Sequence, residues 1–92
     1  MDLINEYTVE RTLSFHEANI LMENLRQDKA SFIARLSILK RNTSDPVLLQ
    51  ELDRLNNKIL DLSEAEYAAL REDAIKGEIL FPPNYTLPKF TL

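Results

Sequence analysis

A single histidine, His16, is the first place to look for chemistry in this 92-residue chain, which contains no cysteine. His16 and Glu17 open the His-Glu-x-x-His pattern of zinc peptidases, in which two histidines four residues apart on a helix hold the metal. Position 20 is Ile20, so the second histidine ligand is missing. We therefore predict no metal site, no cofactor and no catalytic residue, and an exposed His16 in the first turn of a helix.

Six carboxylates between residues 61 and 78 are the second group of side chains that could take part in catalysis. Acid–base catalysis needs two carboxylates that converge in a pocket. The spacing of these six instead follows the solvent face of an amphipathic helix, and an acidic surface for a protein partner is the alternative. The pattern thus argues against an enzyme. The six residues are Asp61, Glu64, Glu66, Glu72, Asp73 and Glu78.

Composition excludes several further classes of function. Gly77 is the only glycine, whereas phosphate-binding loops need two or three at fixed spacing. The net charge is −4 with no basic stripe, which disfavours binding to nucleic acid. No apolar run approaches the ~18 residues of a membrane span, and the acidic start of the chain is not a secretory signal. We expect a protein of the cytoplasm or of a soluble assembly such as a virion.

The strongest pattern is a heptad seam that predicts one long helix over about 15–41. Ser14 and Glu17 form a capping box at its start, and Lys40 and Arg41 suit the negative end of its dipole. Pro46 cannot continue such a helix. Successive seam positions are three and four residues apart, and seven of the eight are apolar. The seam consists of Phe15, Ala18, Met22, Leu25, Lys29, Phe32, Leu36 and Leu39.

A second, bent arm is predicted over about 46–62 and about 64–76. Asp45 caps its first segment and Pro46 is a favourable first helical residue. Ser63 and Glu66 form a second capping box, and Gly77 is a typical helix stop. We therefore predict an all-α protein built as an antiparallel helical hairpin with residues 14–77 as its folded unit.

The two ends of the chain differ from the hairpin. Residues 1–13 form an arm whose pattern fits a strand, an irregular segment or a helical extension. Residues 78–92 contain Pro82, Pro83 and Pro88, which favour an extended tail. Large apolar side chains occupy half of the positions from 79 to 92, and burying each contributes roughly 1.5–3 kcal/mol. We expect this tail to dock, either on its own chain or on a neighbour.

These features favour a non-enzymatic structural or assembly subunit of the bacterial or phage type that forms homo-oligomers. Lys29 is the polar member of the first seam. Either its amine reaches solvent at the edge of the seam, or it pairs with a carboxylate of another helix and so fixes the register or the oligomeric state. Basic residues at the hairpin loop and acidic ones at the opposite end favour head-to-tail contacts. The predicted interface comprises Lys29, Phe32, Leu36, Leu80, Phe81, Tyr85, Leu87, Phe90 and Leu92.

Two other functions are compatible with the same sequence. One is a small regulatory binder, such as an inhibitor, chaperone or adaptor, that covers one partner protein through the hairpin face or the acidic arm. The other is a small-ligand binder that forms its site at a subunit interface with Tyr7, Arg11 or Lys29.

Overall fold

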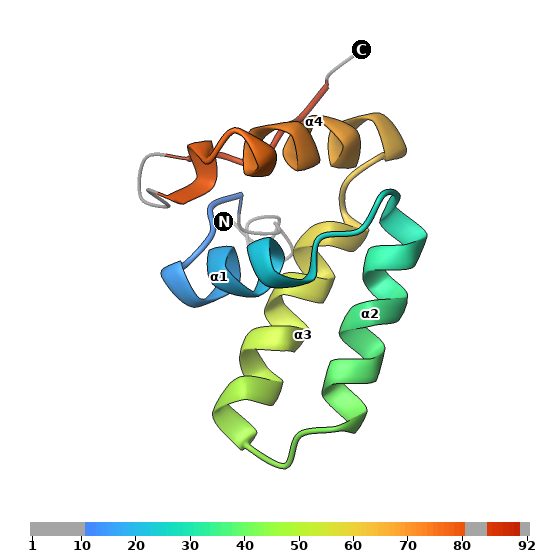
Figure 1. Cartoon of the computed structure of the whole chain (residues 1–92), viewed down its shortest axis with the longest axis vertical. Helices are drawn as coiled ribbons and strands as arrows, with labels where there is room; N and C mark the ends of the chain where they lie inside the picture. The colour runs from blue at the N-terminus through green and yellow to red at the C-terminus, as the bar shows by residue number, and fades with distance from the viewer. Residues whose placement is uncertain (1–10, 81–84, 91–92) are drawn as a thin grey trace, which may run out of the picture.

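The computed structural model of the chain describes residues 11–80 and 85–90, and these residues form a helical fold (Figure 1). The helices are α1 (Phe15–Asn24), α2 (Lys29–Arg41), α3 (Pro46–Leu60) and α4 (Glu64–Ile75), followed by the short 3-10 helix η2 (Glu78–Leu80). The described residues contain no strand beyond an isolated antiparallel bridge between Thr12 and Thr86. The prediction of an all-α protein is confirmed.

The single helix predicted over 15–41 is wrong, because α1 ends at Asn24 and α2 begins at Lys29. Leu25 adopts an extended backbone with a ψ of 136°. The Asp28 carboxylate then accepts a hydrogen bond from the Ser31 amide at 2.8 Å and caps α2. A side chain that accepts a hydrogen bond from a free amide at a helix start lowers the free-energy cost of interrupting the helix there. Ala18 and Leu21 of α1 are buried in the same core as α2. The seam residues Phe15 and Met22 are exposed, so the heptad spacing does not mark the buried face of α1.

The two helices that follow the break begin at their predicted N-cap residues. The Asp45 carboxylate accepts from the Val47 amide at 2.9 Å, and Pro46 is the first residue of α3. Helices α2 and α3 lie side by side, joined by residues 42–45 (Figure 1). Ser63 begins α4 with a complete capping box, and Gly77 follows it with a φ of 80°. Helix α4 does not extend the line of α3 but turns to lie over α1 (Figure 1).

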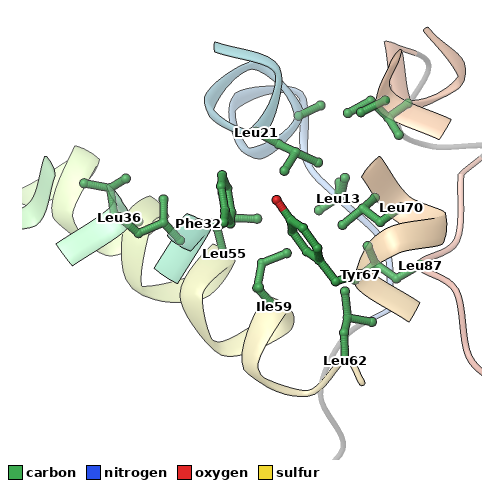
Figure 2. Close-up of a cluster of buried hydrophobic side chains, with 14 residues drawn as sticks. Leu13, Leu21, Phe32, Leu36, Leu55, Ile59, Leu62, Tyr67, Leu70 and Leu87 are labelled. Carbon is green, nitrogen blue, oxygen red and sulfur yellow. The ribbon is translucent and has the colours of Figure 1, made fainter. Parts of the chain in front are cut away.

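The core lies where the four helices meet, with an aromatic pair near its centre (Figure 2). The rings of Phe32 and Tyr67 are 5.9 Å apart, a separation at which aromatic pairs attract. The Tyr67 hydroxyl donates to the Arg26 carbonyl at 2.7 Å, so it also satisfies backbone in the break between α1 and α2. Leu13 and Leu87 reach the same core from outside the helices.

We predict that Phe32→Ala lowers the free energy of unfolding by about 3–5 kcal/mol, because it leaves a cavity beside Tyr67. The matched control is Phe15→Ala, since the Phe15 side chain is exposed and its loss should cost less than about 0.5 kcal/mol. Urea denaturation followed by circular dichroism measures both. Equal effects of the two substitutions would contradict this description of the core.

Candidate functional site: the strap and the exposed apolar residues

Residues 85–90, which we call the strap, run antiparallel to residues 11–13. The Leu87 amide donates to the Arg11 carbonyl at 2.7 Å next to the bridge between Thr12 and Thr86. The Leu87 side chain is only 2% exposed and joins the core beside Tyr67 and other side chains (Figure 2). This part of the predicted tail therefore packs on its own chain.

Arg11 connects the strap to the end of α3. Its Nη1 donates to Asp61 Oδ2 at 2.7 Å, and its Nη2 donates to the carbonyls of Leu87 and Pro88. The planar guanidinium can serve several acceptors at once because its donors point in fixed directions. Loss of this side chain would leave two strap carbonyls and one carboxylate without their donor.

Two carboxylates of α4 hold the ends of the strap. Glu66 Oε2 accepts from the Phe90 amide at 2.6 Å, while Oε1 accepts from the Ser63 amide at 2.8 Å. These hydrogen bonds, chiefly the one from Ser63, lower the pKa of Glu66 because they favour the charged form. At the other end, the Tyr85 hydroxyl donates to Asp73 Oδ2 at 2.8 Å. Burial, and next the bond to Asp73, raises the pKa of Tyr85.

A buried ion pair fixes α1 against α3. Lys58 Nζ lies 2.7 Å from Glu17 Oε1 and also donates to the Thr12 carbonyl at 2.7 Å. Glu17 also accepts a hydrogen bond from the Ser14 amide, so the same carboxylate caps α1 and pairs with Lys58. Because Thr12 is bridged to the strap, the pair also positions the segment on which the strap packs. The sequence reveals the capping role of Glu17, but Lys58 reads as one more residue of a solvated face.

The residues predicted as an interface from the helix seam lie inside the protomer. Lys29 Nζ donates to the Leu62 carbonyl at 2.7 Å and to the Leu60 carbonyl at 3.4 Å. It thus serves the carbonyl end of α3, where a cation is favourable, and not a carboxylate. Phe32 and Leu36 are fully buried in the protomer core. A partner cannot contact these two side chains unless the helices separate.

The residues predicted from the tail divide into three groups. Leu87 is buried and Tyr85 is half-buried against the protomer's own core. Phe90 remains exposed. The others lie outside the described residues, as does Tyr7 of the predicted ligand site; they are the side chain of Leu80 together with Phe81 and Leu92.

Large apolar side chains are exposed at several helix ends and on the strap. Five large ones are between 52% and 61% exposed, and Met22 and Ile38 are exposed to a smaller extent. Helix α1 begins on the same side of the molecule on which α4 ends (Figure 1). Exposed apolar side chains of this size are the parts of the surface that a partner could cover. The five are Phe15, Val47, Leu60, Ile75 and Phe90.

The carboxylate run is less solvated than predicted. Asp61 pairs with Arg11, and Asp73 accepts from Tyr85. Glu66 is only 4% exposed, so the prediction of a solvated face is wrong for this residue. The reason is that α4 packs under the strap, which covers part of its acidic side. These carboxylates act as structural acceptors for neighbouring donors.

The remaining chemical candidates do not form a site. His16 is exposed, as predicted, and its Nδ1 lies 2.5 Å from Glu51 Oε2. Within residues 11–80 and 85–90, histidine and acidic side chains nowhere gather in threes to hold a metal ion. No helix in the described part of the chain is long and apolar enough to span a membrane. Comparisons with protein-family models, curated proteins and solved structures found no match.

We predict that Lys58→Met lowers the free energy of unfolding by about 3 kcal/mol or more, because it leaves the Glu17 carboxylate buried without its cation. The double variant Lys58→Met/Glu17→Gln should regain part of this loss, since glutamine retains the capping box without the charge. Lys40→Met is the control, because the ion pair of Lys40 with Asp53 is exposed and should contribute less than about 1 kcal/mol. A loss equal to that of the control would show that the buried pair is unimportant.

We also predict that acid weakens the anchoring of the strap. The folded-state pKa of Glu66 lies below its ordinary value of 4.5, so its contribution to stability is complete above pH 4.5. That contribution is lost as the pH falls through the lowered pKa. Asp28 acts in the same direction because its pKa is lowered by the Ser31 amide. Glu66→Gln should therefore remove part of the pH dependence of the unfolding free energy below 4.5, and an unchanged dependence would contradict the assignment.

Proposed function

We propose that the chain is a non-enzymatic assembly subunit that acts by binding further copies of itself. The observation that carries the proposal is the set of five large apolar side chains more than half exposed. Their exposure favours association because each would lose contact with water in an interface. The buried seam residues Phe32 and Leu36 already stabilise the protomer, so the contact surface draws on members of the exposed set.

The size of the chain supports the same proposal. A 92-residue chain buries a smaller fraction of its surface than a larger domain does, and it has no disulfide to compensate. Association is a common means by which small domains gain stability. We place the subunit in a soluble assembly of the bacterial or phage type, such as a virion, and propose that it acts without nucleic acid, membrane or cofactor.

Light scattering at several concentrations tests the assembly proposal. The weight-average mass should rise above that of the 10.7 kDa chain as the concentration increases through the micromolar range. A mass that stays at the monomer value over that range contradicts the proposal. A one-to-one complex with a different protein, without self-association, would instead identify a small regulatory binder.

We predict that the strap belongs to its own chain. Thr12 and Thr86 face each other across the antiparallel bridge, where Cα separations suit a disulfide. The double variant Thr12→Cys/Thr86→Cys, made in a chain without other cysteines, should oxidise to a monomer that runs faster on a non-reducing gel. Each single variant is the control. Covalent dimers formed by the double variant and not by the single ones would show that the strap is exchanged between copies.

A further inference from the structure

We infer that Lys89 and Phe90 of one copy dock into a pocket between α1, α2 and α3 of the next copy, a contact that deepens the assembly function proposed above. The inference rests on a pocket with an apolar part, an exposed aromatic side chain, their separate positions in the molecule, and the charges beside each.

The pocket has a volume of about 370 Å³ and opens near the loop end of the α2–α3 pair. Its apolar lining consists of Ile20 from α1, Leu39 from α2, and Leu48 and Leu52 from α3. Glu23 and Asn42 are among the polar residues that line it. The volume is in the range that accepts a small organic molecule, so a phenyl ring and part of a neighbouring side chain fit within it.

Phe90 is suited to enter such a pocket because its backbone is fixed and its side chain is not buried. Its amide donates to Glu66 Oε2 at 2.6 Å, which holds this residue against α4. The side chain nevertheless remains 52% exposed. An aromatic residue already held in position loses little conformational entropy on binding, and aromatic anchors of this kind dominate many interfaces.

Charges beside the pocket and beside Phe90 are complementary. Lys89 is exposed next to Phe90, and the carboxylate of Glu23 is exposed at the pocket. Helix α2 ends at this pocket, and the carbonyls of a helix end also attract a cation. Opposite charges beside Phe90 and beside the pocket favour docking with Lys89 toward Glu23.

The positions of the two surfaces make the contact one between copies. The α2–α3 loop lies at one end of the longest axis of the molecule, and the strap emerges beyond α4 at the other (Figure 1). Phe90 is held against α4, and no residue of α4 or of the strap lines the pocket, so Phe90 does not occupy the pocket of its own chain while the strap is in place. A contact that uses two different surfaces is heterologous and continues from copy to copy, forming a ring or a filament.

Substitution of the anchor and of the pocket provides the first test. Phe90→Ser retains the pocket, whereas Glu23→Lys retains the anchor but places a cation opposite Lys89. Each variant alone should associate about tenfold more weakly than the wild type or worse, measured by sedimentation velocity. An equimolar mixture should form dimers, because one intact contact remains, and circular dichroism checks that both variants are folded.

Ile75→Ser is the matched control, because Ile75 is also exposed and is also followed by a lysine, Lys76. It should leave association unchanged. If the wild type associates, but Ile75→Ser abolishes association and Phe90→Ser does not, the inference is overturned while the assembly function stands. If the wild type remains monomeric, the assembly function itself fails.

A charge exchange tests the pairing of Lys89 with Glu23. Lys89→Glu and Glu23→Lys should each weaken association, and the double variant Lys89→Glu/Glu23→Lys should restore most of it. Restoration supports direct pairing between copies, since Lys89 lies on the strap and no residue of the strap lines the pocket that contains Glu23. Additive weakening in the double variant would overturn the pairing.

Discussion

Closure of the core by segments outside the helices is the constraint on which the rest of this structure depends. The helices surround Tyr67 and Leu70, but Leu13 and Leu87 complete the packing from residues on either side of the helical region (Figure 2). Both residues are nearly inaccessible to solvent. The short antiparallel contact at Thr12 and Thr86 holds these two segments together. The fold is therefore closed by residues that are far apart in the sequence.

Polar groups make this closure specific. Arg11 serves two strap carbonyls and Asp61, while Glu66 accepts from the strap amide of Phe90. Buried carboxylates and carbonyls are costly without donors, so each anchor favours one register of the strap. The same arrangement decides which apolar side chains remain for a partner. It buries Leu87 and leaves Phe90 exposed on a fixed backbone, which is the basis of the proposed contact between copies.

Local signals predicted most helix boundaries from the sequence. Ser14, Asp45 and Ser63 cap α1, α3 and α4 as predicted, because an N-cap depends on a few consecutive residues. The break at residues 25–28 does not follow from the sequence, although Asp28 is a favourable cap, because the heptad spacing continues across it. A period in the sequence does not show whether a helix is continuous, and in α1 it also includes two exposed residues, Phe15 and Met22.

Contacts between distant residues could not be predicted in the same way. The pairing of Lys58 with Glu17 depends on how α3 lies against α1, and nothing in the local sequence distinguishes Lys58 from a solvated lysine. The path of the strap does not follow from the sequence either, because the length of an extended segment does not determine where it packs. The candidate interface changed accordingly, from seam residues that are buried to apolar side chains at helix ends and on the strap.

Hydrogen exchange at the Leu87 amide tests the closure of the core most directly. This amide donates to the Arg11 carbonyl in a segment that is not helical. If the strap is part of the folded protomer, the Leu87 amide should be protected to nearly the same degree as amides of the buried helices, even in dilute solution. Exchange at the rate of an unstructured peptide, while the helices stay protected, would contradict the account.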